Sequence, residues 1–140
     1  MNYAFVPKHI KTNALTDCLS YNDITCHPAF YSAMEFIPDD CFNLIIDKAL
    51  LDCVLCYPSN MTAVTKLVRE MYRVLKPGGV YAVISHGPPE TREGFLVGDE
   101  EAGLRWTISS TTLPKPPIND VQESDVDKSF YVYFCKKTAV

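Results

Sequence analysis

No single periodicity of hydrophobic residues runs through the whole chain, and a pattern that predicts strands and helices begins at about residue 30. Residues 42–47 form a nearly continuous apolar run, which is typical of a strand covered on both faces. Residues 80–85 form a second run of this kind. Between them, apolar side chains recur every three or four positions, which predicts an amphipathic helix beginning near residue 61. The apolar positions of that helix are Val64, Leu67, Val68, Met71 and Leu75.

The order strand, helix, strand predicts a parallel pair joined by a right-handed crossover. Ser59 or Asn60 is predicted to cap the helix at its start. The helix is predicted to end at Pro77-Gly78-Gly79, because glycine adopts backbone angles that other residues resist. A shorter strand is predicted at residues 29–34 and a turn at residues 38–40.

Beyond His86 the chain becomes polar, with a short helix predicted around residues 89–95. Strands are then predicted at residues 106–113 and 130–135, joined by a long acidic excursion. Two such strands at the end of the chain suggest an antiparallel hairpin at the edge of a mostly parallel sheet. The fold class predicted is therefore α/β.

Length and charge narrow the class of protein. A chain of 140 residues is long enough for one domain with a core of its own. A net charge of -4 leaves no basic stripe to neutralise phosphates, so we expect no nucleic-acid partner. No apolar run approaches the length of a membrane span, and no signal pattern opens the chain, so we expect a cytoplasmic protein without a membrane partner.

Two further patterns resemble chemical sites and have simpler interpretations. Cys53-Val54-Leu55-Cys56 has a metal or redox spacing, but a second cysteine pair is missing and Cys26-His27 is a poor substitute. We interpret these cysteines as reduced, buried thiols and expect no metal. The aromatic run at residues 130–134 could stack on bases, but in an acidic chain it favours a packed terminal strand.

Four stretches of the chain match one known pattern and together cover roughly residues 30–137. They are Phe42-Asn-Leu-Ile-Ile-Asp-Lys-Ala-Leu-Leu-Asp52, Tyr72-Arg-Val-Leu-Lys-Pro-Gly-Gly79, Ile84-Ser-His-Gly-Pro-Pro-Glu-Thr-Arg92 and Ser129-Phe-Tyr-Val-Tyr-Phe-Cys-Lys-Lys137. They resemble the second half of a class I S-adenosylmethionine-dependent methyltransferase. The specific resemblance is to a methyltransferase-like group that includes lysine methyltransferases of translation elongation factor 1-alpha.

This resemblance implies an incomplete Rossmann-like fold of the seven-stranded methyltransferase type, mostly parallel with a carboxy-terminal antiparallel hairpin. Residues 1–29 are then a poorly defined amino-terminal segment, and residues 30–140 are the carboxy-terminal part of the domain. The implied cofactor is S-adenosyl-L-methionine. The implied substrate is a protein lysine or a protein amino terminus, with a translation factor as one candidate partner.

The chain departs from the family pattern in its first half. Family members carry an upstream strand ending in a glycine-rich turn, and a second strand ending in an acidic residue that binds the ribose. Here no glycine precedes Gly78, no acidic residue falls at positions 29–33, and Ala49-Leu50 replaces the usual Gly-Thr. The alternative is therefore a truncated or degenerate binding module without catalytic activity. That alternative predicts an exposed apolar sheet edge open to pairing with another chain.

The candidate site residues lie at the ends of the predicted strands at 29–34, 42–47 and 80–85 or follow them, because ligands of open α/β sheets bind at the carboxyl ends of the strands. Ala33, Met34, Asp47 and Lys48 are predicted to bind the cofactor. Asp47 is also predicted to orient the substrate amine, since methyl transfer to nitrogen depends mainly on positioning. The simpler alternative makes Asp47 and Lys48 ordinary polar groups at a strand end.

His86 is the second predicted catalytic residue, because an imidazole can accept a proton near neutral pH. Leu51, Asp52, Glu90 and Arg92 are predicted to lie on the substrate side. The simpler alternative is that His86 bonds the neighbouring backbone and that Glu90 pairs with Arg92 in solvent, an interaction of small energy.

Overall fold

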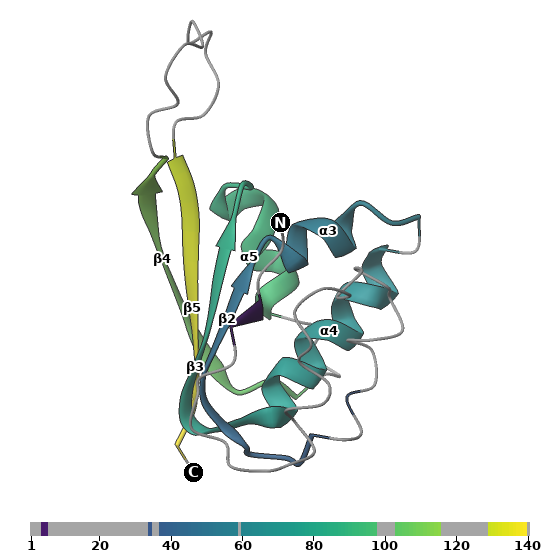
Figure 1. Ribbon diagram of the computed structural model, residues 1–140, viewed down its shortest axis with the longest axis vertical. Helices are drawn as coiled ribbons and strands as arrows, with labels where there is room; N and C mark the ends of the chain where they lie inside the picture. The colour runs from purple at the N-terminus through teal and green to yellow at the C-terminus, as the bar shows by residue number, and fades with distance from the viewer. Residues whose placement is uncertain are drawn as a thin grey trace, which may run out of the picture.

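The computed structural model describes residues 4–5, 34, 37–58, 60–97, 103–115 and 129–139. The elements are β1 (Ala4–Phe5), β2 (Phe42–Lys48), α3 (Leu50–Leu55), α4 (Asn60–Val74), β3 (Leu75–Ser85), α5 (Pro89–Val97), β4 (Trp106–Pro114) and β5 (Ser129–Lys137). Figure 1 shows one mixed sheet with α3 and α4 packed on the same face. Strands β2 and β3 run in the same direction and end at the upper rim in this view.

The sheet has the strand order β1-β2-β3-β5-β4. Strands β2 and β3 are parallel, with Ile46 opposite Ala82 and Lys48 opposite Ile84, as the strand-helix-strand pattern predicted. Strands β4 and β5 pair antiparallel from Trp106 to Pro114, which confirms the predicted hairpin. Within the described ranges only one neighbouring pair is parallel, so seven strands and a parallel majority are not confirmed.

The outer edge of β2 is paired with β1 in the antiparallel sense, with Ala4 opposite Asp47 and Phe5 opposite Ile46. The sequence pattern did not predict this strand. The strand predicted at residues 29–34 lies outside the described residues except for Met34, which is not part of a strand.

Helix α4 buries the predicted apolar positions Val64, Leu67, Val68 and Met71. It ends at Val74, and β3 follows at once, so this strand is longer than the predicted 80–85. Gly78, with φ of +77°, lies where β3 advances five residues while β2 advances two. The glycine turn is therefore an irregularity within the start of the strand, and it keeps the later residues in register.

The core lies between the helices and the sheet, and the Trp106 side chain contacts residues of α4, α5 and β3. The indole Nε1 donates a hydrogen bond to the carbonyl of Leu96 in α5 at 2.9 Å. Its ring meets Tyr72 edge-on at 5.4 Å and stacks on Tyr81 at 6.1 Å. Because these rings come from α4, β3 and β4, the edge strand is fixed against both helices.

At the amino ends of β2 and β3, Arg73 contacts four other residues. We name these five residues the Arg73 cluster (Arg73, Glu70, Met34, Ile37 and Asp39). The guanidinium donates to the carbonyls of Met34 and Ile37 at 2.9 and 2.8 Å. It also pairs with Glu70 at 2.8 Å and Asp39 at 2.6 Å. The cluster fixes Met34, Ile37 and Asp39 against α4.

The end of β5 is tied to the end of α4 by Lys137. Its ammonium donates to the carbonyls of Tyr72 and Leu75 at 2.9 and 2.7 Å, and lies 4.4 Å from the centre of the Tyr72 ring. A cation at this position satisfies carbonyls that the helix end leaves unpaired.

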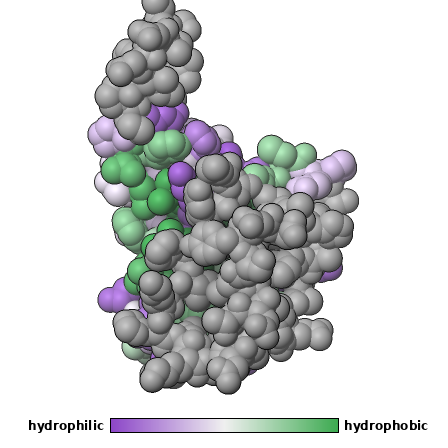
Figure 2. Space-filling view, viewed as in Figure 1, coloured by the Kyte–Doolittle hydropathy of each residue, from purple (hydrophilic) through white to green (hydrophobic). Residues whose placement is uncertain are grey.

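On the surface, hydrophobic side chains gather on the β4–β5 side of the view in Figure 2. The large hydrophobic side chains exposed on these strands are Leu113 and Phe134, at 48% and 39%. Within the described ranges, no helix has both the length and the apolar character needed to cross a membrane.

Candidate functional site

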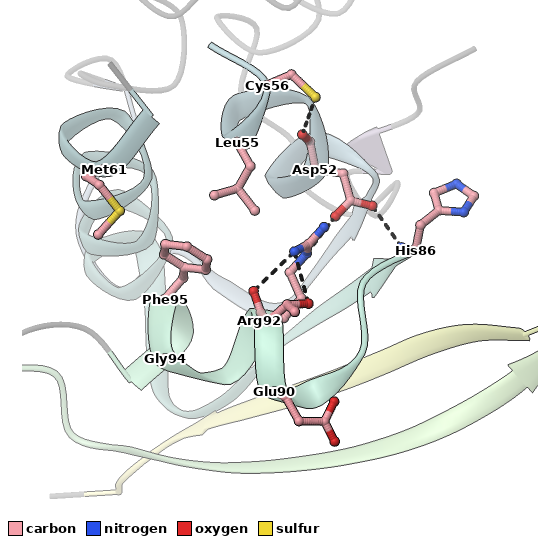
Figure 3. Close-up of a pocket in the computed structure, with 10 residues that line it drawn as sticks. Asp52, Leu55, Cys56, Met61, His86, Glu90, Arg92, Gly94 and Phe95 are labelled. Atoms are coloured by element: carbon pink, nitrogen blue, oxygen red, sulfur yellow. Dashed lines mark hydrogen bonds and ion pairs between the residues drawn. The ribbon is translucent and has the colours of Figure 1, made fainter. Parts of the chain in front are cut away.

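The carboxyl ends of β2 and β3 meet at one rim, where the amide of Ala49 donates to the carbonyl of Ile84 at 2.9 Å. Helix α3 begins directly after β2, and α5 begins four residues after β3. A cleft of about 770 Å³ opens between α3, the start of α4, and α5 (Figure 3). The predicted location of a ligand site at this edge therefore coincides with a real cavity.

The cleft has an apolar wall and a polar wall. Leu55 from α3, Met61 from α4 and Phe95 from α5 surround the opening in Figure 3. Asp52 and Arg92 face each other across the other side and form an ion pair of 3.0 Å. A cleft of this kind can accept an aliphatic side chain along one wall and a polar group at the other.

Asp52 organises the polar wall. Its Oδ1 accepts hydrogen bonds from the Ser85 hydroxyl at 2.5 Å and from Arg92 Nε at 3.0 Å. Its Oδ2 accepts the backbone amide of His86 at 2.9 Å. The Ser85 hydroxyl in turn accepts the amide of Gly87 at 3.0 Å. One carboxylate thus joins α3, the end of β3 and α5.

His86 lies at the outer side of this wall. Its backbone is fixed by Asp52, and its ring meets Phe130 edge-on at 4.9 Å. In Figure 3 the imidazole points away from the centre of the cleft, and so does the Glu90 carboxylate. The partner that the structure gives Arg92 is Asp52, in place of the Glu90 of the simpler alternative.

Asp47 lies beneath the rim, and the residue is 3% exposed. It accepts the amides of Leu50 and Leu51 at 2.7 and 3.2 Å and the Tyr81 hydroxyl at 2.7 Å. It therefore satisfies the first free amides of α3. Burial raises the pKa of Asp47 to about 6, partly opposed by the Tyr81 hydroxyl and these amides.

The turn from β2 into α3 passes through Ala49, whose backbone is left-handed with φ of 65° and ψ of 6°. A side chain with a Cβ costs about 1 kcal/mol or more in this region, and glycine does not. This explains the glycine that the related pattern has at this position. The replacement of Gly by Ala leaves the turn in place and adds strain.

The structure brings together four of the predicted site residues and separates the rest. Those that line the cleft are Asp52, His86, Glu90 and Arg92. Leu51 is fully buried in the core, and Lys48 is exposed at the end of β2 without lining the cleft. The backbone of Met34 is hydrogen-bonded to Glu70 and Arg73 at the opposite edge of the sheet. Met34 therefore does not share a site with Lys48. Ala33 lies outside the described residues.

Several cleft and rim residues had no predicted role. Ser85 and Gly87 stand inside the Ser-His-Gly motif, and that motif was the signal that could have identified them. Tyr81, Met61 and Phe95 occupy ordinary apolar positions of a strand or helix, and nothing in their spacing marks them. Cys56 was expected to be buried but is exposed at the rim of the cleft, because α3 ends there; Cys53 is half-buried.

The described residues supply only part of a site for a cofactor of the methyltransferase type. On the outer side of β2, the related pattern expects a strand ending in a glycine-rich turn. Within the described ranges that place is taken by β1, which runs antiparallel and carries no glycine. These residues do not fit the methionine and ribose end of such a cofactor, although Lys48 and Ala49 lie at the rim beside it.

One comparison with a solved structure supports the fold. A protein of Thermus thermophilus, described as a candidate DNA modification methylase, is similar with a TM-score of 0.54 at 14% identity, over 79% of this chain and 50% of that one. A protein of Methanosarcina mazei described as an S-adenosylmethionine-dependent methyltransferase gives a TM-score of 0.49 at 14% identity, over 78% of this chain and 65% of that one. None of the curated proteins matches the sequence.

The chain thus spans about half the length of the first of these structures. The family described as "Methyltransferase domain" matches residues 13–83, which is just over half of the chain. The cofactor of this family is S-adenosyl-L-methionine. The chain therefore belongs to the methyltransferase domain family, of the class I S-adenosylmethionine-dependent type.

Proposed function

We propose that this chain supplies the substrate side of an S-adenosylmethionine-dependent methyltransferase domain that methylates a protein lysine or a protein amino terminus. The lysine methyltransferases of elongation factor 1-alpha are the group that its motifs resemble, so a translation factor in the cytoplasm is the candidate substrate.

The observation that carries the proposal is the cleft at the carboxyl edge. Four residues that the sequence singled out, from three separate segments, line the same cavity: Asp52, His86, Glu90 and Arg92. Its apolar wall of Leu55, Met61 and Phe95 suits the aliphatic stem of a lysine. The two carboxylates that line the cleft, those of Asp52 and Glu90, outnumber its one guanidinium, that of Arg92, and this charge balance favours a cationic substrate over an anionic one.

The roles proposed for individual residues follow from where they lie. His86 lies at the rim with its imidazole pointing away from the centre of the cleft, and we propose that it accepts, at the rim, the proton that the amine must lose before methyl transfer. Asp47 is enclosed by its three donors, so we propose that it acts by holding α3 and the rim in place. Lys48 is the described residue proposed to lie nearest the cofactor.

The proposal is tested by calorimetric titration of the full chain with S-adenosylhomocysteine, the product form of the cofactor. Saturable binding at micromolar ligand supports the methyltransferase. No heat at millimolar ligand rejects it for this chain and leaves the non-catalytic binding module as the better account. Mass spectrometry of a lysine-containing protein substrate incubated with labelled cofactor then tests transfer directly.

The role of the cleft is tested with a matched pair on α5. Phe95→Ala removes the aromatic side chain of the apolar wall and should raise the KM for the protein substrate by about tenfold, since an aromatic contact of this kind contributes about 1–2 kcal/mol. Val97→Ala, at a side chain 58% exposed and outside the cleft, is the control and should leave the KM unchanged. Equal KM values for the two variants would place the substrate elsewhere.

A further inference from the structure

Gly87 lies where a side chain has no room. A Cβ at this position would lie 2.2 Å from Cζ, 2.5 Å from Nε and 2.6 Å from Nη2 of Arg92. Its backbone is not in the left-handed region, so the conformation itself does not require glycine. What a Cβ at this position would displace is the guanidinium of Arg92, which lies directly against the backbone of residue 87.

In this position Arg92 donates hydrogen bonds to Asp52 and Ser85, the two side chains that accept backbone amides at the rim. Its Nε donates to Asp52 Oδ1 at 3.0 Å and to the Ser85 hydroxyl at 3.1 Å. Both side chains of the ion pair are largely enclosed, with Arg92 19% and Asp52 15% exposed. Removing the guanidinium leaves Asp52 with an uncompensated charge in a place where water screens it poorly.

The amides of the rim depend on the same two acceptors. Asp52 accepts the amide of His86, and Ser85 accepts the amide of Gly87. The carbonyl of Gly87 is held by the Tyr133 hydroxyl at 2.6 Å, so the far side of the loop has an anchor of its own. The loop between β3 and α5 is thus fixed on the cleft side by Arg92 acting through Asp52 and Ser85.

We propose that Arg92 is a positioning residue which, seated against Gly87, holds Asp52 and Ser85 so that they fix the His86 loop at the edge of the cleft. We name these four residues the Arg92 cluster (Arg92, Asp52, Ser85 and Gly87). The inference deepens the proposed function and rests on it only for the effect on substrate. The hydrogen bonds of Arg92 go to Asp52, Ser85 and Thr91, so its effect is on the wall of the cleft proposed to face the substrate.

The test uses Gly87→Ala, which displaces the end of a flexible side chain and leaves every other member of the Arg92 cluster in the chain. Arg92→Gln removes the charge directly. Gly94→Ala, on α5 with nothing within 4 Å of the added Cβ, is the matched control. Hydrogen exchange of the His86 and Gly87 amides is measured by NMR for each variant and for the double variant.

Exchange of both amides should be about tenfold faster in Gly87→Ala and in Arg92→Gln, the factor that corresponds to one lost hydrogen bond. The double variant should be no faster than Arg92→Gln alone, because both changes remove the same contact. Gly94→Ala should exchange like the wild type. Wild-type exchange in Arg92→Gln, or additive effects in the double variant, would overturn the proposal.

The imidazole supplies a second readout. Only three histidines occur in the chain, and His86 is assigned by its loss in His86→Gln. Its ring-current shift from Phe130, removed in Phe130→Leu, should decrease in Gly87→Ala and Arg92→Gln. An unchanged His86 shift in both variants would contradict the proposed positioning.

The kinetic readout separates this inference from the proposed function. Arg92→Gln should raise the KM for the protein substrate by about tenfold and leave the affinity for S-adenosylhomocysteine within about twofold. Lost cofactor affinity would refute a substrate-side role. If the wild-type chain neither binds nor transfers, the proposed function fails, and the exchange and shift measurements still decide whether Arg92 positions the loop.

Discussion

Two arginines hold the two ends of the same sheet, and they do so in different ways. At the amino edge, Arg73 donates five hydrogen bonds, two of them to backbone carbonyls of residues 34 and 37. At the carboxyl edge, the Nε of Arg92 bonds two side chains, and these in turn hold backbone amides of a loop. The first arginine fixes a chain segment directly, and the second acts through intermediates.

The difference matters because only the second arrangement borders a cavity. In the Arg73 cluster the guanidinium attaches Met34, Ile37 and Asp39 to α4, and none of the cluster's members lines the cleft. Two members of the Arg92 cluster, Asp52 and Arg92, line the polar wall of the cleft. The same pairing of an arginine with a carboxylate therefore serves stability at one edge and the shape of a candidate site at the other.

The largest effect is expected at Asp47, which supports the carboxyl edge from within. Its folded-state pKa of about 6 lies above the ordinary 3.8, so its stabilising contribution is complete below pH 3.8 and is lost as the pH rises through 6. That difference corresponds to about 3 kcal/mol. Asp47→Asn cannot ionise, so between about pH 4 and pH 7 the wild type should lose about 3 kcal/mol relative to the variant in urea unfolding.

Tyr81→Phe is the companion variant for this measurement. It removes a hydroxyl that lowers the pKa of Asp47, so the loss of stability should extend to higher pH than in the wild type. Parallel pH profiles for wild type and Asp47→Asn would show that this carboxylate does not govern the carboxyl edge.

A smaller effect is expected when the amino-edge arginine is removed. Arg73→Ala leaves Glu70 and two carbonyls without their partner and should lower the free energy of unfolding by about 2 kcal/mol at neutral pH. Hydrogen bonds from Arg73 lower the pKa of Glu70, so this contribution is present above the ordinary pKa of 4.5 and is lost as the pH falls below it. The deficit of the variant should therefore shrink in acid.

The comparison of the two edges predicts one further result for the same variant. Arg73→Ala should leave the His86 resonance where it is in the wild type, because the Arg73 cluster lies at the other edge of the sheet. Lys76→Ala, at an exposed side chain, is the stability control and should stay within about 0.5 kcal/mol of the wild type. A displaced His86 signal in Arg73→Ala would show that the two edges are coupled.

The smallest expected effect is a gain. Ala49→Gly removes a Cβ from a left-handed residue and should raise the free energy of unfolding by about 1 kcal/mol. Ala63→Gly, inside α4, should lower it by about 1 kcal/mol, because there the helical backbone favours alanine. If Ala49→Gly and Ala63→Gly both destabilise the protein in thermal unfolding, then the backbone at Ala49 is not under strain.

The sequence predicted which segments form helices and strands better than it predicted which side chains contact one another. The apolar face of α4, the parallel pair β2–β3 and the hairpin β4–β5 all follow from local periodicity and are confirmed. Asp52 and Arg92 were singled out by a motif, but their pairing was not foreseen. Met34 was assigned to the cofactor side, and it lies at the other edge because its two backbone groups bond to Glu70 and Arg73.

By itself the sequence determined helix α4 and the strands β2, β3, β4 and β5, and it determined that the polar groups after β2 and β3 meet at one edge. Those properties depend on side-chain periodicity and on the rule that parallel strands end together. Only the tertiary structure decided that Asp47 is enclosed, that Asp52 joins three elements, and that the Arg92 guanidinium lies against the backbone of Gly87. These facts depend on distances between residues far apart in the chain, and no local pattern records such distances.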